Sequence, residues 1–259
     1  MASPELSLVE RRARIDTIAP HIVPVTTAGQ QLLPVVPALA SLFPRAGLQR
    51  GTVVSLAGSG GALSLAFAVC AAASAEGSWL AVVGTERLGL AAVDELGVHL
   101  GRLVLVDAPP VDQWGTVVAT LVDAFDLVLV VTREPIDAGQ ARRLTARARE
   151  RGSVILQVGR WAWPDAPDVR LDVIECRWDG LGEGHGTLTS RQITVTAVNR
   201  RDARPRRKSA LWLPDTEGTV SRVADADEAD TGGWAGSDID ELVEITDAEP
   251  AAVTLADAG

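Results

Sequence analysis

A glycine-rich loop stands between two apolar runs in "VVSLAGSGGALSLAFAVC" and is the first candidate for chemistry. The glycines of the loop are Gly58, Gly60 and Gly61. A strand, a glycine loop and a helix in this order can cradle phosphates with backbone amides, and a lysine directly after the last glycine then neutralises phosphate charge. Here Ala62 takes the lysine's position, Ser64 offers only a hydroxyl, and the single lysine of the chain is Lys208. The sequence therefore predicts a degenerate phosphate loop that serves as a structural turn, with nucleotide binding without hydrolysis as the alternative.

The acidic side chains that would hold magnesium are poorly placed for hydrolysis. Such a site needs a carboxylate at the carboxyl end of a core strand, but the run "DLVLVVT" ends in Thr132, and its acid, Asp126, stands at the opposite end. Glu86 follows the second strand, where a catalytic glutamate would lie, and a helix-capping or surface role is the alternative. The three histidines and two cysteines have neither metal-ligand spacing nor a catalytic motif. We therefore expect no enzyme activity, no metal site and no cofactor.

Basic residues gather in "NRRDARPRRKS" against a single aspartate. They are Arg200, Arg201, Arg204, Arg206, Arg207 and Lys208. A cluster of this kind binds nucleic-acid phosphates through its charge, without reading their sequence. It is a candidate for weak, non-specific DNA contact, while a protein partner, the chain's own acidic end or plain solvation are the alternatives.

Two other groups of residues are candidate protein contacts. Trp178 and Trp212 lie in the second half of the chain, where each can be a core residue or an anchor at an interface. An apolar patch also lies among carboxylates in "GSDIDELVEI", and its members are Ile239, Leu242, Val243 and Ile245. As a helix, this patch would present an apolar face, which predicts an element that folds on a partner; a featureless tail is the alternative.

The candidate residues must be positioned by the secondary structure around them. Short apolar runs, which predict strands, alternate along the chain with segments long enough to form helices. The expected strands are 52–56, 79–83, 103–107, 127–132 and 154–158, and the expected helices are 37–42, 63–75, 88–96, 111–124 and 137–151. This alternation predicts a parallel sheet with helices on both faces, because each parallel connection needs a crossover. Beyond the last helix, "VRLDVIECRWDG" and "RQITVTAVNRR" alternate polar and apolar residues, which predicts antiparallel strands, and "KSALWLP" is expected to add an edge strand.

The net charge of −10 is unevenly distributed along the chain. Residues 215–259 contain thirteen acidic residues and one arginine, so the remainder carries slightly more bases than acids. We predict an N-terminal helix with a proline-rich leader at 1–32, an α/β core at 33–214, and an acidic, largely disordered tail at 215–259. No apolar run approaches a membrane span, and the N-terminus is charged where a signal peptide is apolar, which favours a cytoplasmic protein.

Several blocks together resemble the RecA core, and more closely its ImuA branch of the actinobacterial type, ImuA-prime. They are "LFPRAGLQRGTVVSLAGSGGALSLA", "GSWLAVVGTERLGLAAVDELGV", "RLVLVDAP", "DLVLVV" and "RWDGLGEGHGTLTSRQITVTAVNRR". The resemblance covers roughly residues 33–214. It implies an α/β RecA-like core, in which a mostly parallel sheet is flanked by helices and extended by antiparallel edge strands.

The same resemblance implies a non-catalytic accessory protein of a DNA-damage-induced mutagenesis complex, the mutasome of SOS-induced translesion synthesis. Its implied partner is a noncatalytic Y-family polymerase homologue, similar to ImuB, and through it an error-prone replicative-type polymerase. Two alternatives stay open. One is a weak nucleotide-binding RecA-like ATPase, against which the missing lysine argues, and the other is a regulator that docks on RecA filaments or on the cell-division apparatus.

Overall fold

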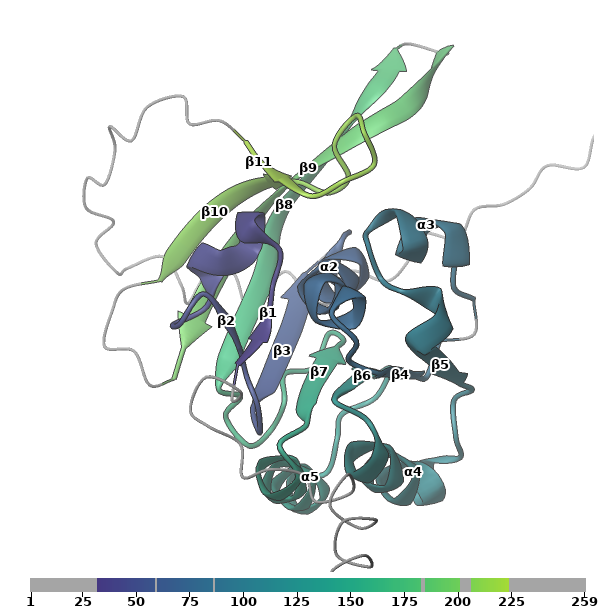
Figure 1. The fold of residues 1–259 in the computed structure, drawn as a ribbon, viewed down its shortest axis with the longest axis vertical. Helices are drawn as coiled ribbons and strands as arrows, with labels where there is room; N and C mark the ends of the chain where they lie inside the picture. The colour runs from purple at the N-terminus through teal and green to yellow at the C-terminus, as the bar shows by residue number, and fades with distance from the viewer. Residues whose placement is uncertain (1–31, 59, 86, 183–184, 201–205, 224–259) are drawn as a thin grey trace, which may run out of the picture. The chain divides into compact units, whose positions relative to one another are not determined.

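A mixed sheet of nine strands organises the protein (Figure 1). The computed structural model describes residues 32–58, 60–85, 87–182, 185–200 and 206–223. Within these residues the strand order is β11-β10-β9-β8-β3-β7-β6-β4-β5. Strands β3 to β7 form the parallel half together with the first part of β8, and β8 to β11 form the antiparallel half.

The parallel half is built from short, mostly apolar strands. They are β3 (Val53–Gly58), β4 (Leu80–Val83), β5 (Leu103–Val106), β6 (Leu127–Val131) and β7 (Val154–Val158). Their connections are α2 (Ala62–Ala75), α3 (Leu90–Glu95) with the 3-10 turn η4 (Leu100–Arg102), α4 (Val111–Ala124) and α5 (Ala138–Arg151). Figure 1 shows α2 and α3 on one face of the sheet and α4 and α5 on the other. Strands covered on both faces need apolar residues throughout, which explains the lack of alternation in their sequences.

The hydrophobic core is divided by the sheet into two layers. One layer packs α2 against the sheet, where Phe67 and Leu65 are fully buried. The other packs α4 and α5, with Val118 and Leu144 buried against the sheet and Trp163 closing the layer. Trp163 donates its indole N–H to Thr145 at 3.0 Å, which satisfies the polar atom of this buried ring.

The antiparallel half is dominated by a long hairpin. Its strands are β8 (Val169–Gly182) and β9 (His185–Asn199), followed by β10 (Arg207–Trp212) and the short β11 (Ser221–Arg222). The β8–β9 register shifts between Val173 and Glu175 and again between Asp179 and Leu181. Figure 1 shows the far end of this hairpin projecting beyond the rest of the sheet.

A small two-stranded sheet precedes the first parallel strand. It pairs β1 (Leu32–Pro34) with β2 (Gly47–Gln49), and the 3-10 helix η3 (Pro37–Leu42) connects them. Leu39, Leu42 and Phe43 are buried in the same core layer as α2. The first residues of the expected core, at 37–43, therefore complete this layer.

The expected α/β fold, with parallel strands, helices on both faces and antiparallel strands beyond them, is confirmed. The expected beginning of the tail at Asp215 is wrong, because the compact unit continues to Val223. The chain turns at 215–219 and returns as β11, so β10 is an inner strand and not the edge. The N-terminal helix expected within 1–32 and the rest of the acidic tail lie outside the described residues. Among the helices that are described, none is long and apolar enough to cross a membrane.

Candidate functional site

The glycine loop closes tightly onto the β8–β9 hairpin. Gly58 ends β3 with φ near 118°, and a Cβ atom placed there would lie 2.2 Å from the carbonyl oxygen of Val173 on β8. Gly61 begins α2 with φ near 113°, and its carbonyl accepts the first helical hydrogen bond, from Leu65 at 2.8 Å. Only glycine adopts these conformations without strain. The predicted loop glycines thus let β3 and α2 approach the hairpin, and Ser64 is half-buried within α2.

An arginine from β9 lies beside this loop. The guanidinium carbon of Arg191 would be 3.7 Å from a Cβ at Gly61, and the side chain is only 8% exposed. Its Nε donates to the carbonyl of Leu213 at 2.6 Å, and its guanidinium lies 4.9 Å from the ring centre of Trp178. Burial lowers the pKa of Arg191, while the nearby Cys176 opposes that change. Because the positive end of a helix repels a cation, the Leu213 carbonyl and the Trp178 ring are needed to hold this guanidinium.

The carboxyl ends of the central strands carry a neutral polar network. Ser55 on β3 donates to the amide oxygen of Gln157 on β7 at 2.7 Å, and the Gln157 amide donates to Thr132 at 2.9 Å. The same amide also donates to the carbonyl of Trp161 at 2.9 Å. All three linked side chains are buried. A magnesium-binding acid would stand at the end of β6. This position is occupied by Thr132, whose hydroxyl is hydrogen-bonded to Gln157 of the neighbouring strand β7.

The nearby acidic residues do not assemble around this network. Asp126 lies at the amino end of β6, where it pairs with Arg50 at 2.8 Å and accepts the backbone N–H of Trp79 at 3.1 Å. Glu134 is exposed, and Glu86 lies outside the described residues. Within the described part of the chain, no group of three or more histidine, cysteine, aspartate or glutamate side chains is arranged to hold a metal ion.

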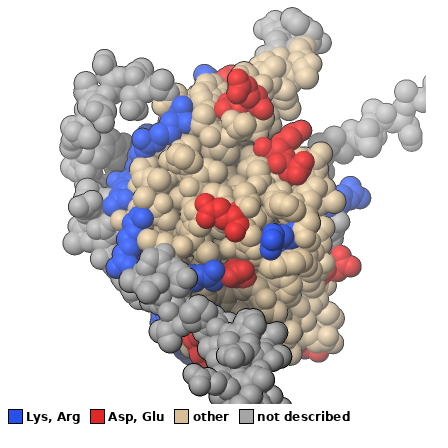
Figure 2. Space-filling view, viewed as in Figure 1, with Lys and Arg blue, Asp and Glu red and all other residues tan. Residues whose placement is uncertain are grey.

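Some residues of the predicted basic stretch bind other parts of the protein, and others are exposed. Arg207 donates to the carbonyls of Ser41 at 2.8 Å and Phe43 at 3.1 Å, so it ties β10 to the end of η3. Arg200 lies 3.4 Å from the carboxylate of Asp168 and donates to the carbonyl of Ala166 at 3.3 Å. Arg206 and Lys208 are exposed, while Arg201 and Arg204 lie outside the described residues. Figure 2 shows Lys and Arg side chains following one margin of the molecule, on the side where Figure 1 places β10.

The residues predicted to contact other proteins differ in their exposure. Trp178 is 41% exposed on the hairpin, whereas Trp212 is half-buried on β10. The hairpin also exposes Ile174 and Leu188. The predicted binding element of the tail, with Ile239, Leu242, Val243 and Ile245, lies outside the described residues.

A crevice at the carboxyl end of the parallel sheet escaped the sequence reasoning. It measures about 330 Å³ and is lined by residues that include Gly84, Trp114, Thr132 and Glu134. It opens where neighbouring strands β4 and β6 send their following helices to opposite faces, the usual ligand position in open α/β sheets. Strand order creates this crevice, and no local sequence pattern encodes strand order.

These features define an α/β fold of the RecA-like kind, and comparison with solved structures agrees. The RadB recombinase structure matches with a TM-score of 0.52 and 15% identity, over 72% of this chain and 97% of that chain. At this level of identity the likeness concerns the fold alone.

Sequence comparisons find similarity over part of the chain. Residues 41–165 match the family described as the MT3502 N-terminal domain. The uncharacterized protein Rv3395c of Mycobacterium tuberculosis is 36% identical over 116 residues, which are 44% of this chain and 55% of that protein. The chain thus matches about half the length of this curated relative. Residues 41–165, the region of the family match, include the glycine loop and the five parallel strands β3 to β7.

Proposed function

We propose that the chain is a RecA-like accessory protein that acts by binding other proteins, without ATP hydrolysis, in a DNA-damage-induced mutagenesis complex. The observation that carries the non-catalytic part is the neutral Ser55–Gln157–Thr132 network beneath a loop that has no lysine. Phosphoryl transfer needs cations that neutralise the transferred group and an acid that holds magnesium. Among the described residues, the Arg191 guanidinium lies beside the loop, but it is buried and held by the Leu213 carbonyl. No group of acidic side chains in this part of the chain is arranged to hold a metal ion.

The place of this protein in mutagenesis rests on the sequence resemblance to the ImuA branch. The proposed partner is the noncatalytic Y-family polymerase homologue, and through it the error-prone replicative-type polymerase. The exposed Trp178 of the β8–β9 hairpin supports a role in protein contact, because tryptophan is enriched among the residues that carry binding energy at interfaces. The exposed Arg206 and Lys208 support a weak, non-specific contact with DNA.

Affinity purification tests the proposal directly. A tagged full-length chain is purified from cells treated with a DNA-damaging agent and from untreated cells, and co-purifying proteins are identified by mass spectrometry. We expect the Y-family homologue and the error-prone polymerase in the treated sample. Recovery of RecA or division proteins, with neither polymerase, would favour the regulator function instead.

A further inference from the structure

An arginine without an acidic partner among the described residues lies beside the glycine loop. Arg191 and Trp178 are directly paired across β9 and β8, and Cys176 lies two residues before Trp178, on the same face of the hairpin. The Cys176 sulfur would be 3.2 Å from a Cβ atom at Gly60. The Arg191 guanidinium carbon would be 3.7 Å from one at Gly61. The loop, the start of α2 and these three side chains therefore border the same small region of the surface.

The terminal nitrogens of Arg191 can be reached by a ligand. Its Nε donates to the carbonyl of Leu213 at 2.6 Å, but none of the described residues accepts a hydrogen bond from the two terminal nitrogens. Within the same residues, the amide oxygen of Asn199 is the one side-chain polar atom that is both enclosed and without a partner. The Arg191 terminal nitrogens also lack a partner, so they must retain accessible surface. The 8% of Arg191 that is exposed therefore includes hydrogen-bond donors.

The positive charge at this position is not compensated by the protein. Burial lowers the pKa of Arg191 and Cys176 opposes this change, while none of the described carboxylates contributes. Gly61 caps α2 without a side chain, and the first turn of α2 contains no acidic residue. The first N–H groups of the helix therefore add partial positive charge beside the guanidinium. A largely buried cation next to a helix N-terminus favours the binding of an anion.

We propose, on the basis of the protein-binding function above, that Arg191 binds the carboxylate of an aspartate or glutamate in a partner protein, with Trp178 in contact with the residues beside it. The two terminal nitrogens of a guanidinium match the two oxygens of a carboxylate. One guanidinium also balances the single charge of a carboxylate, whereas a nucleoside triphosphate would bring several negative charges to a loop that has no lysine. Arginine and tryptophan are both enriched among the residues that carry binding energy at interfaces.

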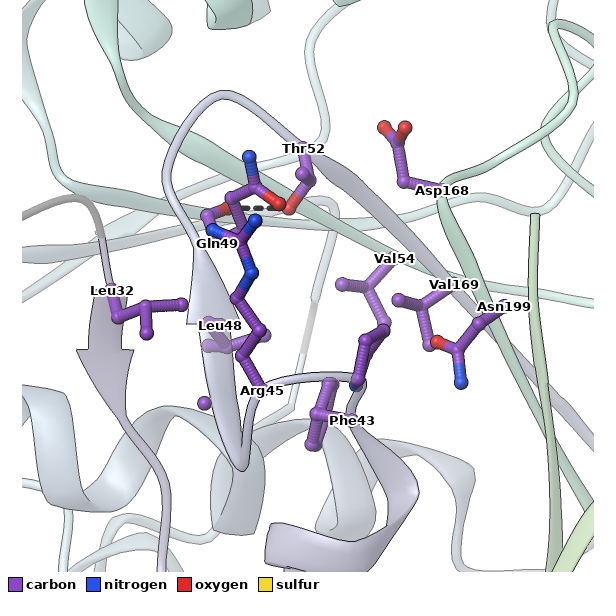
Figure 3. A pocket seen from close by; sticks show the side chains of 12 residues that line it. Leu32, Phe43, Arg45, Leu48, Gln49, Thr52, Val54, Asp168, Val169 and Asn199 are labelled. Atoms are coloured by element: carbon purple, nitrogen blue, oxygen red, sulfur yellow. Dashed lines mark hydrogen bonds between the residues drawn. The ribbon is translucent and has the colours of Figure 1, made fainter. Parts of the chain in front are cut away.

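Two capped peptides, acetyl-Leu-Glu-Leu-amide and acetyl-Leu-Gln-Leu-amide, test the site because they differ only in the carboxylate. Ligand-observed NMR titration of the full-length chain measures both affinities. We expect the glutamate peptide to bind about tenfold more tightly, the factor for a hydrogen bond between charged groups. Arg191→Met should remove this preference. Arg45→Met is the matched control and should preserve it, because Arg45 is exposed at the rim of a cavity beside the amino end of β3, the end opposite the loop (Figure 3).

Alkylation of Cys176 tests the site without any substitution, and so also if Arg191→Met fails to fold. Cys176 is exposed and Cys70 is buried, so iodoacetamide should label Cys176 first. The glutamate peptide, at about four times its dissociation constant, should slow this labelling about fivefold, because only about one chain in five remains unoccupied. Mass spectrometry of the intact chain follows the labelling.

Equal affinity of the two peptides would overturn the inference, as would no binding of either peptide at millimolar concentration. Inorganic phosphate that slows the labelling of Cys176 at lower concentration than the glutamate peptide would also overturn it, because the site would then prefer phosphate groups. Neither peptide contains the Y-family homologue. These outcomes therefore leave the proposed role in mutagenesis unaffected, and a failure to co-purify the homologue would leave the carboxylate site unaffected.

Discussion

Gly58 lies at the point where the backbone of β3 meets β8, and this contact explains why the loop is rich in glycine. Its φ near 118° is unfavourable for a residue with a side chain, and the Val173 carbonyl fills the place that a Cβ atom would take. A Cβ atom placed on Gly61 would lie 3.4 Å from a methyl carbon of Ile193, which is far less crowded. The glycines thus allow the backbone of the loop to lie close to the β8–β9 hairpin.

Gly58→Ala should therefore lower the free energy of unfolding by at least about 2 kcal/mol, because backbone strain and a clash with a main-chain oxygen act together. Urea denaturation followed by circular dichroism measures the change. Gly218→Ala is the control, since Gly218 also has a positive φ, near 84°, but no neighbouring atom within 4 Å of the added Cβ. The control should cost about 1 kcal/mol. Equal losses in the two variants would show that the contact with β8 is unimportant.

The loop should support no ATP turnover. We expect the purified chain to hydrolyse ATP at the rate of a buffer blank, with or without single-stranded DNA, because Ala62 offers no charge and Thr132 holds no magnesium. A coupled assay for released phosphate measures this rate. Turnover that disappears in Glu86→Gln would contradict the expectation, because it would show that this carboxylate serves a functioning site.

Sequence reasoning found the glycines and the missing lysine because both are local features. It did not place Arg191 beside the loop, because this residue stands 130 positions after Gly61 in the chain and reaches the loop only through the pairing of β8 with β3 and β9. It likewise gave Arg207 a role in binding phosphates, whereas the structure joins it to η3. A charge pattern does not reveal which basic side chains are engaged by distant carbonyls.

At the scale of elements, the turn before β11 depends on one carboxylate. Asp215 accepts hydrogen bonds from the backbone of Glu217 and Thr219 and from the hydroxyls of Thr219 and Ser221, at 2.8 to 3.0 Å. Partial burial raises the pKa of Asp215, but these hydrogen bonds outweigh that effect and hold the pKa below its ordinary value of 3.8. The ionised form therefore favours the folded turn.

Asp215→Ala should destabilise the turn and β11 by about 1–2 kcal/mol, the loss of several hydrogen bonds to a partly exposed carboxylate. Hydrogen exchange at the β10–β11 amides measures it. In the parent chain this contribution is present above the unfolded-state pKa and is lost as the pH falls through the lowered folded-state pKa. Asp215→Ala should therefore remove the acid sensitivity of these amides. If their exchange stays unchanged at neutral pH, the carboxylate does not hold β11.

The helices and strands of the parallel half were predictable because buried strands and their crossovers have strong apolar patterns. The helix expected at 111–124 agrees with α4, and the strand expected at 154–158 agrees with β7. β1, β2 and β11 have two or three residues each, too few for a periodic pattern. Their positions are decided by side-chain contacts such as that of Arg222 with Ser41, 2.6 Å apart.

At the scale of the whole molecule, charge is separated along the chain. Residues 224–259 carry eleven acidic residues and no lysine or arginine, so their removal changes the formal net charge from −10 to +1. The basic margin around β10 remains in the shortened chain (Figure 2). The acidic segment should oppose binding to a polyanion simply through its charge.

Truncation after Val223 should therefore strengthen binding to single-stranded DNA at low salt, by about tenfold, and the gain should fade as salt rises. Fluorescence anisotropy with a labelled oligonucleotide measures both effects. The cut preserves β11, which the compact unit contains. Replacing Arg206 and Lys208 by alanine in the truncated chain should reverse the gain. A salt-independent affinity would show that charge is not what holds the DNA.

The last prediction concerns the apolar patch of the acidic tail as a contact for the Y-family homologue. A short apolar face among carboxylates suits a partner groove with basic edges, and a tail that folds on binding leaves the core's own stability unaffected. Replacing Ile239, Leu242 and Val243 together by serine should therefore reduce co-purification of the homologue at least about tenfold and lower damage-induced mutation, while the melting temperature stays the same. Val253→Ser with Leu255→Ser is the matched control, because it removes apolar residues from the same tail outside the patch, and it should leave both readouts intact. Full co-purification with the triple variant would place the contact elsewhere, and the exposed Trp178 on the β8–β9 hairpin would then be the next surface to alter.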